Sequence, residues 1–267
     1  KDQRLELEGA EGVELLEASY PTVNYVELNT DNSIFSDINV RKAFCHAINR
    51  DEFAEISEGS VSPAYSIIID SMQCFDQKAK DWFQKTYNYD PEKAKSLLEK
   101  AGWVDSDGDG IREKDGKKLE FTFLAFTDWT TIPEAMTNQL KEVGFDMSIE
   151  ALEYNYIHDR CNEDNYDMGI AGLAWAEPLL IFNICYYDKN APGNDDTYRK
   201  MVEAVASEPD TEKRVEKVGE TQMRMFENVN IIPLFMDNSY TAIRSEIKGI
   251  VAEADGTLST ADMYFEK

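Results

Sequence analysis

The clearest chemical pattern in the sequence is an acidic, glycine-rich run over residues 105–116. Its carboxylates recur at every second position and a glycine follows at the sixth, as Asp105, Asp107, Asp109 and Gly110. Alternating carboxylates of this kind converge on one hard cation, and the glycine permits the turn that brings them together, as in the first half of an EF-hand loop. The twelfth position is Gly116, not the bidentate glutamate of an EF-hand, so the pattern is incomplete.

Two interpretations of this run stay open. In the first, Asp105, Asp107, Asp109 and Asp115 hold a structural calcium ion, and Glu113 is a further candidate for the missing ligand. In the second, the run is a tight Asp/Gly turn that joins a helix to a strand. Neither interpretation requires a cofactor for function.

Motifs of the common catalytic sites do not occur in the sequence. It has no GxSxG elbow, HExxH pair, GxGxxG loop or phosphate-binding P-loop. We expect His46 to be structural, and His158 to lie in a polar loop where Asp159 and Cys161 could join it around a metal. Chance pairs of carboxylates are inevitable among 52 acidic residues, so a glycosidase-like acid pair carries little weight. We predict no catalytic residue and a protein that is not an enzyme.

The net charge of the chain narrows the choice of partner. Among 267 residues, 27 are Lys or Arg and 52 are Asp or Glu, which leaves a net charge of −25. Nucleic acids and anionic lipid surfaces both require a basic surface, so neither is an expected partner.

The cysteines form no CxxC pair, and their pairing stays open for Cys45, Cys74, Cys161 and Cys185. Cys45 lies on the apolar face of an expected helix, which favours a buried free thiol.

Helices and strands are interspersed along the chain, and these elements must position the side chains named above. Alternating apolar residues predict strands over residues 23–29 and 145–150, and a continuous apolar run predicts a buried strand over residues 166–174. Further strands are expected over residues 119–126, 231–236, 240–244 and 249–251. Apolar residues at helical spacing predict helices over residues 38–55, 91–101, 132–143, 196–207 and 211–228. Asp90-Pro91 and Gly102 mark the two ends of the second helix. The order of elements predicts an α/β class with a mixed sheet.

Several segments, in this order, resemble the family 5 extracellular solute-binding proteins, which are the oligopeptide-, dipeptide- and nickel-binding components of ABC importers. The first runs from Leu28-Asn29-Thr30 through Phe35-Ser36-Asp37 to Asn49-Arg50-Asp51-Glu52. The second runs from Tyr89-Asp90-Pro91 to Ala101-Gly102-Trp103 and leads directly into the acidic run. The last is Ile232-Pro233-Leu234-Phe235.

This resemblance implies a two-lobed fold like that of the periplasmic binding proteins, with the N-terminal lobe largely absent from this chain. We expect residues 1–22 to be an incoming hinge or linker, residues 23–230 the second ligand-binding lobe, and residues 231–267 a segment that returns to the first lobe. The implied function is the substrate-binding component of an ABC transporter, which captures a small solute, in most relatives an oligopeptide, and delivers it to permease subunits. The full-length protein is expected to be a monomeric, extracellular or periplasmic lipoprotein anchored to the membrane.

Two other functions stay open at this point. One is a carbohydrate-binding importer component, and the other is an acidic carbohydrate hydrolase. A calcium-organised interaction module is a third class, which calcium-dependent binding to a macromolecule would support.

The resemblance also indicates ligand-contacting residues, at a place where the chain departs from the family. In peptide-binding relatives a strand ends in Gly-Trp, and an aspartate in the next loop holds the peptide amino terminus. Here Gly172 fits the strand end, Leu173 replaces the tryptophan, and the aspartate has no clear counterpart. Trp175 and Glu177 are the remaining candidates in the loop, as a flat apolar wall and a countercharge. The alternative is that Trp175 packs in the core and Glu177 caps the helix that begins at Pro178.

Overall fold

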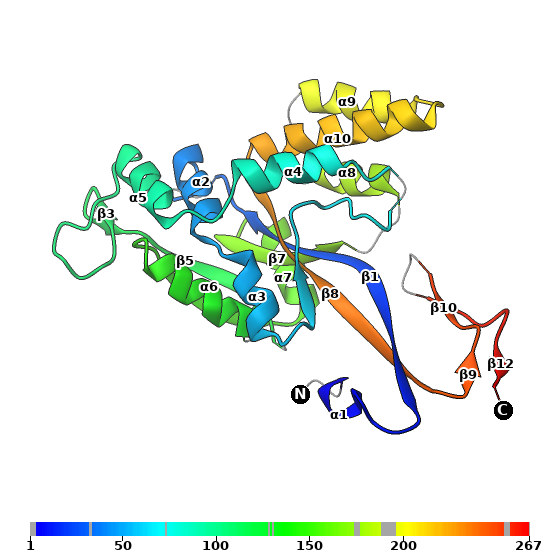
Figure 1. Cartoon of the computed structure of the whole chain (residues 1–267). Coiled ribbons are helices and arrows are strands. Elements are labelled where there is room, and N and C mark those ends of the chain that lie inside the picture. The colour runs from blue at the N-terminus through cyan, green and yellow to red at the C-terminus, as the bar shows by residue number, and fades with distance from the viewer. Residues whose placement is uncertain are drawn as a thin grey trace.

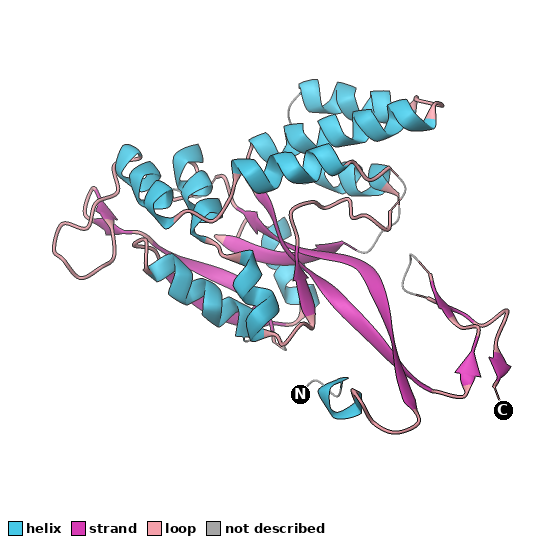
Figure 2. Ribbon diagram, in the orientation of Figure 1, coloured by secondary structure: helices cyan, strands magenta, loops and turns pink. Residues whose placement is uncertain are grey.

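The computed structural model describes residues 4–31, 34–72, 74–127, 129, 131–173, 177–187, 196–253 and 257–266. The first elements are α1 (Arg4–Leu7), β1 (Val13–Leu28), α2 (Ile38–Ala47), α3 (Arg50–Ile56), β2 (Val61–Pro63), α4 (Gln77–Thr86), α5 (Pro91–Lys100), β3 (Glu113–Lys114), β4 (Lys117–Lys118) and β5 (Glu120–Phe126). They are followed by α6 (Thr131–Lys141), β6 (Asp146–Leu152), α7 (Tyr154–Asn162), β7 (Met168–Leu173), α8 (Pro178–Tyr187), α9 (Asp196–Ala206), α10 (Thr211–Glu227), β8 (Ile231–Arg244), β9 (Ile247–Lys248), β10 (Val251–Ala252), β11 (Leu258–Ser259) and β12 (Tyr264–Phe265). Figures 1 and 2 show a body of helices packed on one sheet, and a two-stranded arm that projects from it.

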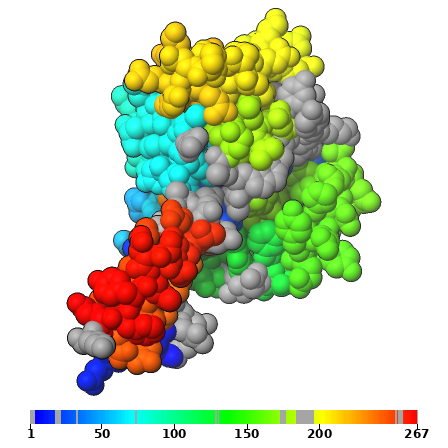
Figure 3. Space-filling view, turned by 90° about the vertical axis from the view of Figure 1, so that its right-hand side faces the viewer, coloured from blue at the N-terminus to red at the C-terminus, as the bar shows by residue number. Residues whose placement is uncertain are grey.

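The main sheet is mixed and has six strands in the order β2-β8-β1-β7-β5-β6. β5 runs parallel to both β6 and β7, whereas β1 is antiparallel to β7 and to β8. β1 and β8 pair from Glu27↔Ile231 to Val13↔Arg244, and the outer part of this ladder, residues 13–19 with 238–244, is the arm. Both ends of the chain lie beside the arm (Figure 1), and the space-filling view shows it standing apart from the body (Figure 3).

Helices cover the sheet and supply the core. α4, α8, α9 and α10 gather at one end of the molecule (Figure 1), while α3 contacts β8 and α6 contacts β6. The buried core is continuous and rich in aromatic side chains, such as Phe35, whose ring centroid lies 4.9 Å from that of Phe121. Within the described residues, no helix combines the length and apolarity needed to cross a bilayer.

Local signals account for several helix boundaries. Asp90 is the N-cap of α5 and accepts a hydrogen bond from the Lys93 amide at 3.0 Å, and Pro91 occupies the first helical position. Gly102 follows α5 with a φ of +88°, the left-handed conformation that glycine adopts without strain. These contacts confirm the predicted ends of this helix.

The structure corrects other expectations. The predicted helix over residues 38–55 is two helices, because Ile48 and Asn49 are extended. Gln139 of α6 makes this break tolerable: its Oε1 accepts from the Asn49 amide at 3.0 Å and its Nε2 donates to the Asn49 carbonyl at 3.2 Å. The strands predicted over 231–236 and 240–244 are one strand, β8. His158 lies on α7 and not in a loop.

Candidate functional site

Three parallel strands end at the same edge of the sheet, beside the root of the arm. β5 ends at Phe126, β6 at Leu152 and β7 at Leu173, while β1 and β8 continue past this edge as the arm. Ligands of open α/β sheets bind outside the carboxyl ends of the strands. We call this region, from Phe126 to Leu173 and the neighbouring part of β1, the ligand-binding edge.

The sheet opens at this edge. The pairing of β5 with β7 covers Phe123↔Met168 and Leu124↔Gly169, although β5 continues to Phe126 and β7 to Leu173. The two strands therefore diverge toward their carboxyl ends, as Figure 1 shows. The carboxyl ends of the strands are the usual position of a ligand in such sheets.

Gly172 lies on this edge and is exposed, as a ligand contact requires. It pairs with Asn24 of β1, whose side chain is 2% exposed and donates from Nδ2 to Asp237 Oδ2 at 2.8 Å. A Cβ at Gly172 would lie 3.1 Å from Asn24 Oδ1, so only glycine leaves this space open. The sequence pattern did not indicate Asn24, because strict alternation along β1 predicts a solvent-facing polar residue there.

The loop after β7 is only partly described. The backbone of Leu173 ends β7 opposite Val23, and Trp175 lies outside the described residues. Glu177 precedes α8, and its Oε1 accepts from the Leu179 amide at 3.0 Å and from Arg214 Nη2 at 2.6 Å. Its side chain, 44% exposed, is thus engaged in a helix-capping contact and an ion pair.

Arg214 of α10 contacts two other segments, at Glu177 and at Cys74. Besides the contact with Glu177, its Nη1 donates to Cys74 Sγ at 3.2 Å. Hydrogen bonding to Glu177 and the negative groups nearby raise the pKa of Arg214, against the opposing effect of burial. Because Glu177 already has a cationic partner, its charge is largely neutralised within the protein.

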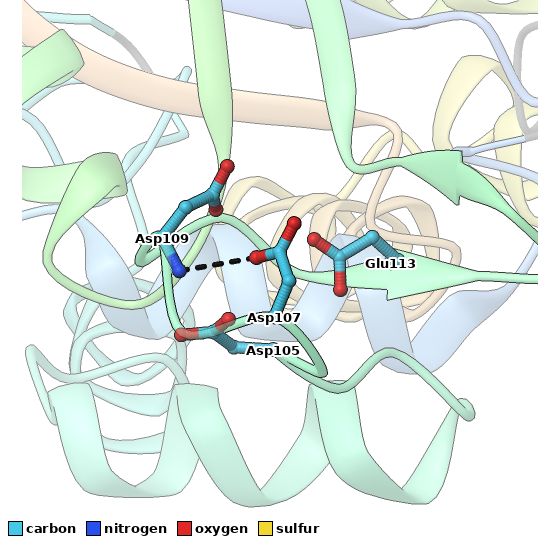
Figure 4. A group of neighbouring side chains, drawn as sticks. All are labelled: Asp105, Asp107, Asp109 and Glu113. Carbon is cyan, nitrogen blue, oxygen red and sulfur yellow. Dashed lines mark hydrogen bonds between the residues drawn. The ribbon is translucent and has the colours of Figure 1, made fainter.

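The acidic run forms a compact loop between α5 and β5 (Figure 4). Oxygens of Asp105, Asp107, Asp109 and Glu113 all lie within 4.8 Å of one another. Backbone amides support three of the carboxylates: Gly108 N donates to Asp105, Asp109 N to Asp107 and Ile111 N to Asp109, at 2.8–3.1 Å. Oxygens at this spacing suit a hard cation such as Ca²⁺.

The fourth member of the cluster is Glu113 and not Asp115. Asp115 lies in the β3–β4 turn with a φ of +54° and is exposed. Glu113 Oε2 accepts from the amide and hydroxyl of Ser106, but its Oε1 is buried without a hydrogen-bond partner. Lys118 Nζ pairs with Asp109 and lowers the pKa of that carboxyl by hydrogen bonding. The donor set fits a cation, with Lys118 as an internal competitor.

The remaining candidates for chemistry are structural. His46 is 2% exposed, its Nδ1 donates to the Asn88 carbonyl at 2.7 Å, and burial lowers its pKa. Burial raises the pKa of the Cys45 thiol to about 12. Among the described residues, Cys45, Cys74 and Cys161 form no disulfide, and the side chain of Cys185 lies outside the described set. His158 is exposed and accepts from Asn162 Nδ2 at 3.0 Å, and in the described part of the chain it forms no metal-binding group with Asp159 and Cys161.

Comparison with known proteins defines the class to which this edge belongs. Residues 2–194, more than half of the chain, match the family described as bacterial extracellular solute-binding proteins, family 5 middle. The oligopeptide-binding protein AppA of Bacillus subtilis is 31% identical over 157 residues, which make up 57% of this chain and 28% of AppA. The chain belongs to the family 5 solute-binding proteins of ABC importers.

Solved structures show the same fold. NikA from Brucella suis, in complex with Fe(III)-EDTA, matches with a TM-score of 0.83 at 21% identity, over 99% of this chain and 55% of NikA. AppA from Bacillus subtilis, in complex with a nonapeptide, matches with a TM-score of 0.77 at 20% identity, over 99% of this chain and 55% of AppA. The chain thus spans about half the length of these structures, and its mixed α/β lobe is part of a periplasmic-binding-protein fold. The predicted fold class and family are confirmed.

Proposed function

We propose that this chain is the greater part of one lobe of a substrate-binding component of an ABC importer, which captures an oligopeptide outside the cytoplasm and delivers it to permease subunits. The observation that carries the proposal is the ligand-binding edge, where β5 and β7 diverge next to the exposed Gly172. An oligopeptide is favoured over other solutes by the relative AppA, which is named as an oligopeptide-binding protein. The proposed role is binding without catalysis.

In this proposal, residues 23–230 form the lobe together with the start of β8, whose residues 231–235 are buried in its sheet. Residues 1–22 and the remainder of 231–267 connect it to the rest of the protein. Exposed aromatic side chains near the end of the chain support such a connection: Tyr264 is 56% and Phe265 62% exposed. Aromatic side chains with this much free surface suit a further packing partner. A monomer anchored to the membrane by a lipid belongs to the same proposal.

The solute can be identified directly. The full-length protein is purified without denaturation, and the small molecules that copurify are released and analysed by mass spectrometry. We expect short peptides. A relative named as a nickel-binding periplasmic protein, from Escherichia coli, makes a metal chelate the first alternative, and an oligosaccharide is the second. Recovery of either in place of peptides would overturn the peptide assignment.

The chain alone should bind its solute very weakly. A ligand enclosed between two lobes loses most of its contact area when one lobe is missing. Isothermal titration of a peptide that the full-length protein binds should therefore show a large loss of affinity for residues 1–267. Micromolar binding by this chain alone would contradict the two-lobed site.

We further propose that the acidic loop holds a structural calcium ion through Asp105, Asp107, Asp109 and Glu113, in place of the Asp115 expected from the sequence. The buried, unpartnered Oε1 of Glu113 supports this choice. A cation bound only by the native state raises the unfolding midpoint. Millimolar calcium should therefore raise the melting temperature relative to chelator, and Glu113→Gln should reduce the shift, whereas Asp146→Asn, at an exposed acid outside the cluster, should retain it. Equal midpoints with calcium and chelator would refute the site.

A further inference from the structure

Glu177 lies at the far end of the connection that leaves the ligand-binding edge. β7 ends at Leu173, three residues follow, and α8 begins at Pro178, directly after Glu177. Glu177 caps this helix, because its Oε1 accepts from the Leu179 amide at 3.0 Å and its carbonyl accepts from the Leu180 amide at 3.1 Å. A connection of three residues has little length with which to take up a displacement, so the position of Glu177 bears on the end of β7.

Arg214 of α10 fixes that position. Its Nη2 donates to Glu177 Oε1 at 2.6 Å, and its Nη1 donates to Cys74 Sγ at 3.2 Å. The guanidinium is planar, so the contact at Nη1 sets the direction in which Nη2 points. A cavity of about 470 Å³, lined by Cys74, Pro209, Thr211 and Arg214, borders the same side chain. Hydrogen bonds, and not packing on every side, therefore hold the guanidinium in place.

We propose that Arg214 is a positioning residue for the solute site, which acts through Glu177 to hold the connection from β7 in place and does not touch the solute. The inference rests on the proposed function and adds to it a residue remote from the ligand-binding edge. It assigns Glu177 to the support of the site and not to contact with the solute. Ordering a segment at the moment of binding costs free energy, and a restraint that exists beforehand removes that cost. Loss of the pair should therefore lower the affinity for solute.

The test measures solute retention beside stability. Full-length protein is equilibrated with a randomised tetrapeptide pool, retained peptides are quantified by native mass spectrometry, and the urea midpoint of each variant is recorded. Arg214→Met removes the charge-assisted hydrogen bonds, and we expect retention to fall about tenfold, the effect of one such contact. Arg214→Lys should recover part of this loss, because an ammonium group can still pair with Glu177.

A double-mutant cycle and a control separate positioning from a general loss of stability. In a Glu177→Ala background, Arg214→Met should change retention by less than about twofold, because its effect passes through Glu177. The control is Lys217→Met. Lys217 lies one turn further along α10 and pairs with Glu208, which follows α9, at 2.5 Å. This variant should keep wild-type retention even if its urea midpoint falls as far as that of Arg214→Met.

The possible failures differ in meaning. If wild-type protein retains no peptide, the proposed peptide function itself fails. If wild-type protein binds, the inference alone fails when folded Arg214→Met retains as much as wild type, when Lys217→Met loses as much, or when Arg214→Met loses tenfold without Glu177 as well. Should Arg214→Met not fold, Glu177→Ala decides: a tenfold loss supports the inference, and wild-type retention refutes it.

Discussion

Gln222 of α10 closes a buried hydrogen-bond network with the segment that follows β2. Its Oε1 accepts from the Ile67 amide at 3.1 Å, from the Ile68 amide at 3.0 Å and from Ser66 Oγ at 2.9 Å. These four residues are at most 4% exposed. Residues 66–68 belong to no helix or strand, so the Ile67 amide depends on this side chain, and the Ile68 amide shares itself between Gln222 and Ser66 Oγ.

The substitution Gln222→Leu keeps the size of the side chain and removes the acceptor. The Ile67 amide then loses its partner, while the Ile68 amide keeps a longer contact with Ser66 Oγ at 3.2 Å. A buried group without a partner costs about 1–3 kcal/mol, so the free energy of unfolding should fall by about 2–4 kcal/mol. With a slope of about 3 kcal/mol per molar urea, the midpoint should move down by about 1 M.

Urea titration followed by far-ultraviolet circular dichroism measures this shift in the chain itself. The matched control is Gln77→Leu on α4, because Gln77 bonds Asp81 on an exposed helix face. That variant should change the free energy of unfolding by no more than about 0.5 kcal/mol. Equal midpoints for the two variants, with equal slopes, would refute the account of Gln222 as the partner of buried amides.

Three further predictions concern stability and reactivity. Gly219→Ala should lower the free energy of unfolding although alanine favours helices, because the new Cβ would lie 2.0 Å from Asp76 Oδ2. Adding Asp76→Ser, whose shorter side chain can still cap α4, should recover the lost stability in urea titrations. Burial lowers the pKa of His46 below 6.5, so the unfolded chain binds a proton at a higher pH than the folded chain does. The free energy of unfolding should therefore fall as the pH drops through about 6.5. His46→Asn should flatten this fall, and His158→Asn, at an exposed site, should not. The Cys45 thiol, with its pKa raised to about 12, should resist iodoacetamide at pH 8 in native protein and react in urea, as peptide mapping would show.

Contacts between residues that lie a few positions apart could be predicted from the sequence. Asp90 and Lys93 are three residues apart, and the contact between them follows from the helix-start pattern alone. The acidic loop likewise converges because its oxygens are neighbours in sequence, although Glu113 and not Asp115 completes it. Asp115 is not part of the cluster because it lies in the β3–β4 turn, which was not predicted and which directs it away from the other carboxylates.

Contacts between distant segments left no signal in the sequence. Asn24 and Asp237 are separated by 213 residues, and Glu177 and Arg214 by 37. No periodicity or motif specifies such pairs, because they depend on strand order and register. A polar residue in an alternating strand is expected to face solvent, whereas Asn24 is 2% exposed and its amide lies between Asp237 and Gly172.

Arg50, in the first segment that resembles the family, contacts the start of β8, the strand beside β1. Arg50, 2% exposed, donates from Nε to the carbonyl of Pro233 at 2.8 Å, which ties the start of β8 to α3. The β1–β8 ladder shifts register twice, between residues 19 and 23 at the root of the arm and between Asn24 and Tyr25. Asn24 therefore lies between two irregularities, whereas Tyr25 and the residues after it pair regularly with the part of β8 that Arg50 contacts. Because irregularities of this kind bend a strand and increase its twist, they account for the arm leaving the direction of the main sheet at this point.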